Sequence, residues 1–379
     1  MTILFIIAVI LFLYPLVIYP VIIALFARLF PNPVQQSKGP YFPSVTFIIP
    51  AFNEEAVVEA KLKNTLALDY PKDRIEILLA SDGSSDRTTE IARQISDPSV
   101  TILDFPMRRG KLSVLKDALH QASGDIVAFS DTSAILKADA LSLLVANFAD
   151  DSVGCVSGRY VVSNDLTPIE DGRSSGERGY FEFEVFQRKQ ESLFYSTLGA
   201  HGAFYAIRRS LAPDIPEKII NDDFVIPMLI VEKGFRTVYE DQSLVYEYHQ
   251  ATIDGEFKRR TRISHGNFQQ IFFLSGLLGF SKPKVSFVFW SHKVLRAFQP
   301  APLLVILLTP LGMEGIAPKA FFLLQILFYL LGGLAISTRS RTKLLAIPLY
   351  FTLGNAAIIA GFSRFLKNRP HTALHWEKS

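Results

Sequence analysis

The sequence predicts an α/β protein with a mainly parallel sheet, flanked at both ends of the chain by apolar helices long enough to cross a membrane. Three short apolar runs, at residues 45–49, 75–79 and 126–129, alternate with helix-like stretches at residues 56–68, 88–95 and 112–122. Strands that alternate with helices are typical of βαβ units, which build parallel sheets. Long uncharged segments at the two ends predict the flanking helices.

Each of the three apolar runs is followed at once by a polar cluster. The clusters are Asn53-Glu54-Glu55, the stretch at residues 81–86, and Asp131-Thr132-Ser133. In open α/β sheets the ligand binds outside the carboxyl ends of the strands, where all three clusters fall. The sequence therefore predicts one ligand site built from three loops.

The first membrane segment, residues 3–27, is uncharged and forms about 37 Å of helix at roughly 1.5 Å per residue. A cleaved signal peptide is the alternative, but no basic region precedes this run and the run is too long. Three further uncharged segments lie at residues 297–313, 320–338 and 344–363. The aromatic segment before them carries Lys282 and Lys284, which favours a position along the membrane interface.

These observations predict five regions along the chain. They are an N-terminal transmembrane helix (1–30), a central α/β domain (31–267), an interfacial amphipathic segment (268–296), about three C-terminal transmembrane helices (297–366) and a tail (367–379).

Basic residues near the first span predict its orientation. No Lys or Arg precedes that span, whereas Arg28 and Lys38 follow it, and basic residues are retained on the cytoplasmic side. The central domain is therefore expected in the cytoplasm of a multi-pass protein of the cell inner (plasma) membrane. The single Cys155 suits that reducing compartment. Four crossings would leave the basic tail outside, against the same rule, so the number of crossings stays open.

The composition and charge of the chain exclude several classes of protein. The chain has 379 residues, of which 49% are hydrophobic, and this is too apolar for an ordinary soluble enzyme of this size. The membrane-length segments exclude a soluble binding module. The net charge of +3 is mild, and no basic low-complexity run suggests nucleic acid. The lipid bilayer is thus the expected large partner, and the small basic surplus suits anionic lipid and diphosphate.

The chemistry of the three loops is acidic rather than glycine-rich. The dinucleotide-binding pattern Gly-x-Gly-x-x-Gly is missing after the first run, and Gly110-Lys111 is followed by Leu112, so no phosphate-binding P-loop is present. Carboxylates at these positions favour a hard divalent cation, Mg²⁺ or Mn²⁺, that bridges a diphosphate.

Four motifs in this order resemble glycosyltransferase family 2. They are Pro50-Ala51-Phe52-Asn53-Glu54-Glu55, Ser81-Asp82-Gly83-Ser84-Ser85-Asp86-Arg87-Thr88, Gly110-Lys111 and Phe129-Ser130-Asp131. The resemblance covers about residues 43–270 and implies a GT-A-type, Rossmann-like domain that binds nucleotide sugars and inverts the anomeric centre. The membrane arrangement looks like that of the polysaccharide-synthase and ceramide-glucosyltransferase-like members.

The resemblance implies roles for individual residues on the donor side. The residues expected to bind the nucleotide-sugar donor are Pro50, Ala51, Asn53, Glu54, Asp82, Ser84, Lys111 and Asp131. Asp131 is the expected metal ligand. The family usually has Asp-x-Asp here, but this chain has Ser133 at the third position.

The resemblance also implies an acceptor side and a catalytic group. Gly199, His201 and Gly202 match the segment that lines the acceptor. Asn221-Asp222-Asp223 matches the family's acidic pair, so Asp223 is the expected catalytic base and Asp222 its neighbour. Arg259 and Arg262 match a motif that neutralises the departing diphosphate, although Ile263 replaces the Trp that follows in the family.

Each of these residues also has a structural interpretation. Asp82, Ser84 and Asp131 could serve only as turn or helix-cap residues. One of Asp222 and Asp223 could cap a helix, and the arginines could form a solvated face. The glycine-rich stretch that starts at Gly199 could reflect close backbone packing alone.

The resulting hypothesis is a membrane-bound inverting hexosyltransferase that moves a sugar from a nucleotide donor, UDP first, to a growing polysaccharide or a lipid-linked glycan. Partners in polysaccharide assembly are compatible with this hypothesis. The alternative is a single transfer to a glycolipid of the ceramide or polyprenyl type. A third hypothesis, an inactive transferase-like membrane scaffold or transporter, predicts missing site residues.

Overall fold

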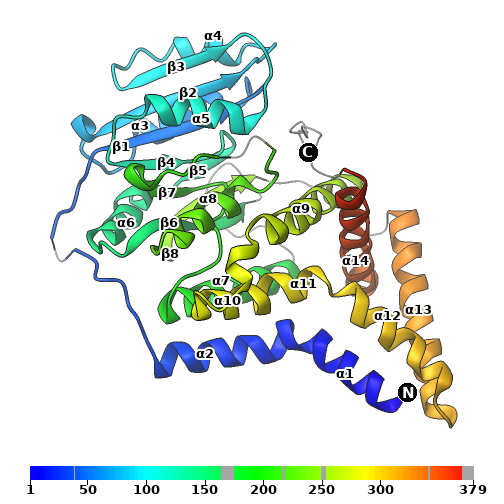
Figure 1. Cartoon of the computed structure of the whole chain (residues 1–379). Coiled ribbons are helices and arrows are strands. Elements are labelled where there is room, and N and C mark those ends of the chain that lie inside the picture. Colours follow the sequence, from blue (N-terminus) through cyan, green and yellow to red (C-terminus); the bar gives the residue numbers. More distant parts are fainter. Residues whose placement is uncertain (38, 164–174, 216–217, 249–252, 340–341, 369–379) are drawn as a thin grey trace. The chain divides into compact units, whose positions relative to one another are not determined.

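The computed structural model describes residues 1–37, 39–163, 175–215, 218–248, 253–339 and 342–368. The chain forms two compact units, which are considered separately here. The first contains residues 23–250 and holds all the strands (Figure 1). The second contains residues 1–22 together with the helices that follow residue 250.

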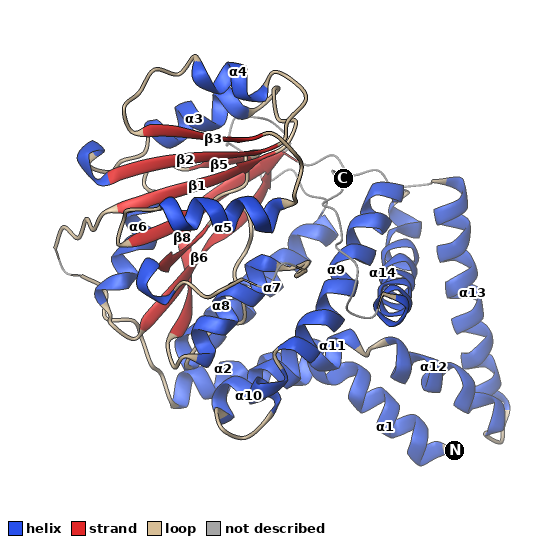
Figure 2. Cartoon of the chain, turned by 45° about the horizontal axis from the view of Figure 1, so that its top comes forward, coloured by secondary structure: helices blue, strands red, loops and turns tan. Residues whose placement is uncertain are grey.

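The strand-containing unit is one sheet with helices on both faces (Figure 2). The strands are β1 (Val45–Ala51), β2 (Ile75–Asp82), β3 (Val100–Phe105), β4 (Ile126–Phe129), β5 (Ala134–Leu136), β6 (Val153–Ser163), β7 (Tyr205–Arg208) and β8 (Arg236–Tyr248). The helices are α3 (Val58–Leu66), α4 (Thr88–Arg93), α5 (Lys111–Gln121), α6 (Ala140–Ala146), α7 (Ser175–Phe194) and α8 (Asp222–Glu232).

The sheet has the order β3-β2-β1-β4-β7-β6-β8-β5. Its first half is parallel: β2 pairs with β1 and β3, and β1 pairs with β4. The second half is mixed, because β7 runs antiparallel to β4 and β6, and β5 runs antiparallel to β8. The predicted α/β class is confirmed, and the three predicted strands are β1, β2 and β4.

Two apolar layers hold the sheet between its helices. On one face, Val58 and Leu62 of α3 and Leu141 of α6 pack with Phe47 of β1. On the other face, α5 and α8 pack against the alternate residues of the same strands, as shown by the contacts of Val114, Ile226 and Ile48. Buried β1 contributes to both layers, which explains its unbroken apolar sequence.

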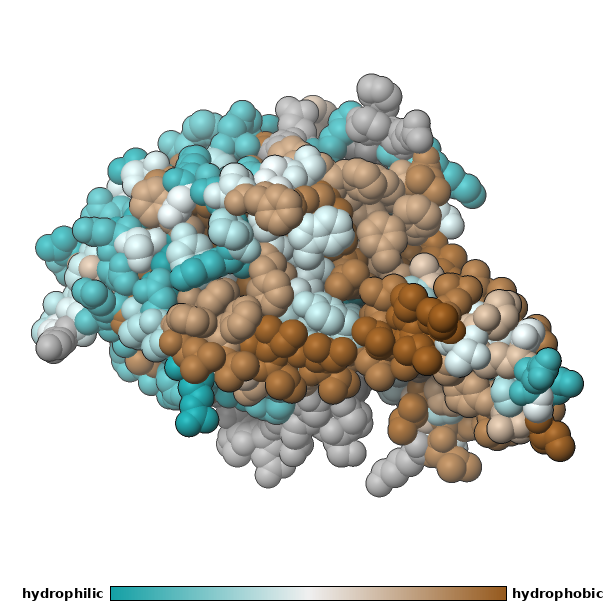
Figure 3. All heavy atoms as spheres, turned by 60° about the horizontal axis from the view of Figure 1, so that its bottom comes forward, coloured by the Kyte–Doolittle hydropathy of each residue, from teal (hydrophilic) through white to brown (hydrophobic). Residues whose placement is uncertain are grey.

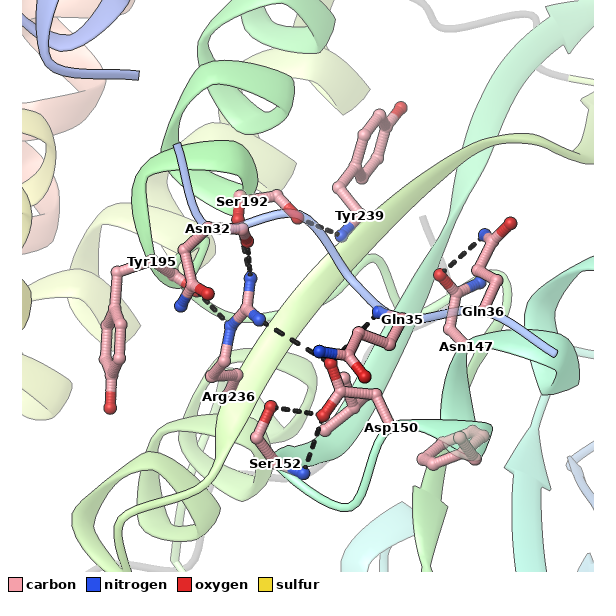
Figure 4. Close-up of polar contacts among 12 residues, drawn as sticks. Asn32, Gln35, Gln36, Asn147, Asp150, Ser152, Ser192, Tyr195, Arg236 and Tyr239 are labelled. Atoms are coloured by element: carbon pink, nitrogen blue, oxygen red, sulfur yellow. Dashed lines mark hydrogen bonds and ion pairs between the residues drawn. The ribbon is translucent and has the colours of Figure 1, made fainter. Parts of the chain in front are cut away.

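A polar strap, defined as residues 32–36, runs along the strand-containing unit and is fixed by Arg236 of β8 (Figure 4). The Arg236 guanidinium is buried and donates to the carbonyl oxygens of Asn32, Ser192 and Tyr195 at 2.6–3.1 Å. The Asp150 carboxylate lies 3.9 Å from the same guanidinium and accepts a hydrogen bond from the Gln35 amide at 3.1 Å. The strap is thus held by polar contacts, and Val34 within it also packs against the apolar core of this unit.

The other unit is helical. Its helices include α1 (Thr2–Leu13), α9 (Ile253–Phe273), α10 (Pro283–Val288), α11 (Leu295–Ala297), α12 (Pro300–Leu308), α13 (Ile316–Thr338) and α14 (Lys343–Lys367), and α2 (Tyr19–Leu29) begins in it. Helices α9 and α14 approach closely, since a β carbon at Gly361 would lie 2.6 Å from Ser264 Cβ. Phe268 of α9 also packs on Phe362 of α14, with ring centroids 4.8 Å apart.

Among the described residues, three helices are long and apolar enough to cross a membrane: Thr2–Leu29, Ile316–Thr338 and Leu344–Lys367. A fourth candidate is the pair Pro283–Ala297 and Pro300–Gly312, which is bent by 56°. The segment predicted at residues 297–313 is therefore the second half of a bent pair. The segment predicted to start at residue 268 begins inside α9, which continues to Phe273.

Many apolar side chains on these helices face outward, as expected for helices that contact lipid. On α13 they include Leu323, Leu324, Leu327, Leu330 and Leu334, which are 52–65% exposed. Apolar residues form extended brown areas on the face in Figure 3, while hydrophilic residues, in teal, gather on other parts of that face.

Candidate functional site

Hydrogen bonds connect the loops that follow β1 and β2, and most of them involve residues predicted to bind the donor. Asn53 adopts a left-handed backbone conformation with φ of 52°, which Asn tolerates better than most residues. Its side-chain oxygen Oδ1 accepts a hydrogen bond from the Ser85 backbone amide at 2.8 Å, and its backbone amide donates to Ser84 Oγ at 3.1 Å. The Glu54 amide donates to Thr88 Oγ1 at 2.7 Å. The structure thus brings Asn53, Glu54 and Ser84 together as predicted.

Asp82 organises a third loop at the same edge. Its two carboxylate oxygens accept hydrogen bonds from the amides of Arg109 and Gly110 at 2.7 and 2.8 Å. A β carbon at Gly83, whose φ is +66°, would lie 2.5 Å from the Arg108 nitrogen, so only glycine fits there. The structural role considered for Asp82 is therefore present. Each of its oxygens keeps a second lone pair for a ligand donor.

Lys111 begins α5 and directs its ammonium group at two acids. Its Nζ lies 2.8 Å from Asp131 Oδ1 and 3.7 Å from Asp222 Oδ2. Burial opposes the charged form of Lys111, but the charges of Asp131 and Asp222 dominate and raise its pKa above the ordinary lysine value. Lys111 is thus a permanent cation between the loop after β4 and the start of α8.

Asp223 lies in the first turn of α8 and faces the glycine-rich loop. The Gly202 amide donates to Asp223 Oδ2 at 3.1 Å, and the Ala200 amide donates to the Asp223 carbonyl oxygen at 2.7 Å. Burial, with the nearby charges of Asp222 and Asp131, raises the pKa of Asp223 to about 6, while Lys111 acts in the opposite direction. A carboxyl group with this pKa can accept a proton near neutral pH.

Gly202 lies next to the carboxylates of both Asp131 and Asp223. A β carbon at this position would be 3.2 Å from Asp223 Oδ2 and 3.6 Å from Asp131 Oδ2. Lys111 occupies the other oxygen of Asp131, and no described residue donates a hydrogen bond to Oδ2. The missing side chain therefore leaves a small space bordered by two acidic oxygens.

This space suits a divalent cation that is also bound by its ligand. Carboxylate oxygens are the preferred ligands of Mg²⁺ and Mn²⁺. In the described part of the chain, no group of three or more His, Cys, Asp or Glu side chains could hold a metal ion. A cation at Asp131 would therefore rely on phosphate oxygens for much of its coordination, as Mg²⁺ sites in proteins commonly do.

His201 stacks on Tyr160 of β6, with ring centroids 4.1 Å apart and an interplanar angle of 13°. Its Nδ1 accepts a hydrogen bond from the Ala203 amide at 3.3 Å, so the neutral ring carries its hydrogen on Nε2. Gly199 has φ of +64°, and a β carbon there would lie 2.5 Å from the Phe224 ring. Close packing therefore explains Gly199, whereas Gly202 borders the acidic space.

The remaining predicted residues have different surroundings. Pro50 lies in β1, which is buried throughout, and lines a small pocket together with Lys111 and Asp131, whereas Ala51 ends that strand and is fully buried. Arg259 and Arg262 lie on α9 in the helical unit, where Arg259 donates to Glu256 at 3.1 and 3.2 Å. A role for these arginines in catalysis stays a prediction.

Sequence reasoning missed Lys61, a fully buried lysine of α3. Its Nζ donates to Ser130 Oγ and to the Ala134 carbonyl oxygen, both at 2.6 Å, and so bridges the two ends of the loop that carries Asp131. A signal was present, because Lys61 falls on the apolar face of its helix, beside Val58 and Leu62. A lysine on that face is unusual unless it is paired.

Comparison with known proteins identifies the domain. Residues 46–215 match the family model described as "Glycosyl transferase family 2". This part of the chain belongs to glycosyltransferase family 2. The match begins in β1, includes all three loops and Gly202, and ends before α8.

Curated relatives of this glycosyltransferase domain include synthases of polysaccharide. The chain is 27% identical over 233 residues to the poly-beta-1,6-N-acetyl-D-glucosamine synthase of Staphylococcus aureus, covering 59% of this chain and 55% of that protein. It is also 27% identical over 234 residues to the probable glycosyltransferase YdaM of Bacillus subtilis. The chain thus spans about half the length of the curated relatives it matches.

Among solved structures, the mannosyltransferase PcManGT of Pyrobaculum calidifontis, determined in complex with GDP-Man and Mn²⁺, has a TM-score of 0.75. The alignment covers 97% of this chain and 99% of that one, at 24% sequence identity. This similarity shows a shared fold, including the helices at both ends, and confirms the predicted GT-A-type class.

Proposed function

We propose that this chain is a membrane-bound inverting glycosyltransferase that transfers a sugar from a nucleotide donor to a growing polysaccharide or a lipid-linked glycan. The observation that carries the proposal is the space over Gly202, bordered by Asp131 and Asp223, beside the ammonium group of Lys111. The three candidate spans, together with the basic residues after the first of them, support a protein of the plasma membrane with this domain in the cytoplasm.

The proposed mechanism assigns one task to each carboxylate. Asp223, whose raised pKa keeps it basic near neutral pH, takes the proton of the acceptor hydroxyl as that oxygen attacks the anomeric carbon. Asp131 and Lys111 lie on the side of the leaving diphosphate. A Mg²⁺ or Mn²⁺ ion held by Asp131 would neutralise the charge that develops there.

The donor loops supply binding and orientation. Asp82, Asn53 and Ser84 hold three loop segments in a fixed arrangement before any ligand arrives. Such preorganisation lowers the ordering cost of binding a nucleotide. A UDP-sugar is the first candidate donor, and a GDP-sugar, as named for the structural neighbour, is the second.

The acceptor has two candidate classes. The Staphylococcus aureus relative, named for synthesis of an N-acetylglucosamine polymer, supports a growing polysaccharide. Ile263 in place of the family's Trp favours a single transfer to a lipid of the ceramide or polyprenyl type. Partners in polysaccharide assembly belong only to the first class.

The proposal is tested by incubating membranes that contain the full chain with labelled UDP- and GDP-sugars and Mn²⁺. Polymer that lengthens with time is expected for a polysaccharide synthase, and label confined to the solvent-extractable lipid indicates a single transfer. Membranes from cells without the protein serve as the control. Absence of protein-dependent transfer from every donor would leave the inactive scaffold or transporter as the better hypothesis.

The dependence of activity on pH should report the state of Asp223. The free enzyme is inactive while this base is protonated, so kcat/KM is expected to rise with pH through about 6 and to level off above that value. The negative charge of Asp222 raises the pKa of Asp223, whereas Lys111 lowers it and Asp131 raises it. Asp222→Asn should therefore move the rising limb to lower pH, even if the absolute rate falls.

The matched control for the pH profile is Asp214→Asn. Asp214 is exposed and pairs with Lys116 at 2.6 Å. Its replacement should leave the midpoint of the rising limb in place. A midpoint that does not move in Asp222→Asn would contradict the assignment of this limb to Asp223.

A further inference from the structure

The loop that carries Asp131 is fixed from several directions. Lys61 binds the residues at its two ends, Ser130 and Ala134. Inside the loop, Thr132 Oγ1 donates to the Pro50 carbonyl oxygen at 2.6 Å. These contacts leave Ser133 in a defined position, two residues after the expected metal ligand.

Ser133 is paired with a carboxylate from a distant strand. Its hydroxyl donates to Glu247 Oε1 at 2.5 Å. Glu247 lies on β8, and the antiparallel register of β5 and β8 sets it opposite Ala134. A hydrogen bond from a hydroxyl to an ionised carboxylate is of the charge-assisted kind.

The bond to Glu247 changes what Ser133 can offer a cation. A hydroxyl has one hydrogen and two lone pairs, and Ser133 commits its hydrogen to Glu247. The carboxylate polarises the hydroxyl and increases the negative charge on Oγ. Ser133 therefore offers a neutral oxygen ligand at the sequence position where Asp-x-Asp has its second aspartate, and Glu247 supplies the negative charge next to it.

The charges of Asp131 and Glu247 both act on the buried Lys61. Burial lowers the pKa of the Lys61 ammonium to about 7, and the charges of Asp131 and Glu247 both act against that shift. Since Lys61 is fully buried, it depends on these acids and on its two hydrogen bonds to remain in the core.

We propose that Ser133 and Glu247 act together as the second acidic position of the divalent-cation site, replacing the aspartate missing from the loop. Glu247 is a positioning residue in this arrangement, because it acts on the cation through Ser133. The proposal rests on the proposed function, since it concerns the Mg²⁺ or Mn²⁺ ion that accompanies a nucleoside diphosphate.

Glu247→Gln tests the charge while keeping the shape. The amide oxygen can still accept the Ser133 hydrogen bond, so the loop should keep its position. We expect the affinity for Mn²⁺, measured by electron paramagnetic resonance on the full chain with UDP or GDP present, to fall by about 10-fold or more. Affinity for the nucleotide without metal should stay the same, which a merely structural effect on the loop would not predict.

Three further variants test whether Ser133 and Glu247 act as one unit, and the first of them moves the carboxylate into the loop. Ser133→Asp combined with Glu247→Gln should recover most of the lost Mn²⁺ affinity. Ser133→Ala should weaken Mn²⁺ binding on its own, and adding Glu247→Gln to it should have little further effect, since the two residues act as one unit. This test holds even if one single variant folds poorly.

Glu240→Gln is the matched control, because Glu240 also lies on β8 but pairs with Gln36 and Asn147. It should bind Mn²⁺ as the unchanged protein does. Equal Mn²⁺ affinity of Glu247→Gln and the unchanged protein would overturn the inference alone. Failure of the unchanged protein to bind Mn²⁺ with either nucleotide would instead overturn the proposed function on which the inference rests.

Discussion

Asp223→Asn is expected to lower kcat for sugar transfer about 10²- to 10⁴-fold, the range typical for loss of a general base. Asparagine can still accept the hydrogen bond from the Gly202 amide, so the loop geometry should be kept. In the proposed mechanism Asp223 serves the acceptor, and its hydrogen bonds go to Gly202 and Ala200 rather than to the loops after β1 and β2, so the Kd for UDP or GDP should be unchanged. Transfer of labelled sugar and equilibrium nucleotide binding, measured on the same preparation, check the two statements.

Asp214→Asn serves again as the control for Asp223→Asn. It removes one exposed carboxylate from the same unit and should leave kcat unaffected. If Asp223→Asn retained full activity together with normal nucleotide binding, another group would have to be the base.

Arg236→Met is expected to lower the free energy of unfolding by about 3–5 kcal/mol, the range for removing one partner of a buried polar pair. The guanidinium is only 3% exposed and satisfies three backbone carbonyl oxygens as well as lying beside Asp150. Methionine fills similar space but leaves the three carbonyl oxygens without this donor and removes the cation beside Asp150. Thermal unfolding of the full chain in detergent should show a midpoint lower by about 6–15 °C.

Arg93→Met provides the comparison on the surface. Arg93 pairs with Asp104 at 2.7 Å, but the two side chains are 60% and 34% exposed. Exposed ion pairs contribute about 0–1 kcal/mol, so its melting midpoint should shift little. Similar shifts for the two variants would contradict the role given to the buried contacts of Arg236.

The sequence alone predicted three strands of the parallel half of the sheet, because each of them has a recognisable apolar pattern. β1, β2 and β4 are buried on both faces and therefore read as continuous apolar runs. β3 was missed because it is an edge strand whose residues are only half buried. β6 and β8 were missed because they pair across long separations, which no local pattern reports.

The residues of the candidate site likewise fall into those that local sequence predicts and those that only tertiary packing brings together. The motif residues Asn53, Asp82 and Asp131 each follow a recognisable strand, so their convergence could be predicted from the topology of parallel sheets. The contact between Ser133 and Glu247 spans 114 residues and depends on the register of β5 with β8. That register is set by tertiary packing, so the sequence alone showed a missing aspartate but not a nearby glutamate.

The strap also constrains the order of events during synthesis. Asn32 and Arg236 are 204 residues apart, so at roughly 5–20 residues per second a growing chain needs about 10–40 s between making one and making the other. Throughout that interval the backbone of residues 32–36 has no partner from β8. The first apolar helix thus leaves the ribosome well before the strap that follows it can receive its hydrogen bond from Arg236, and a chain that stops short of residue 236 lacks this contact.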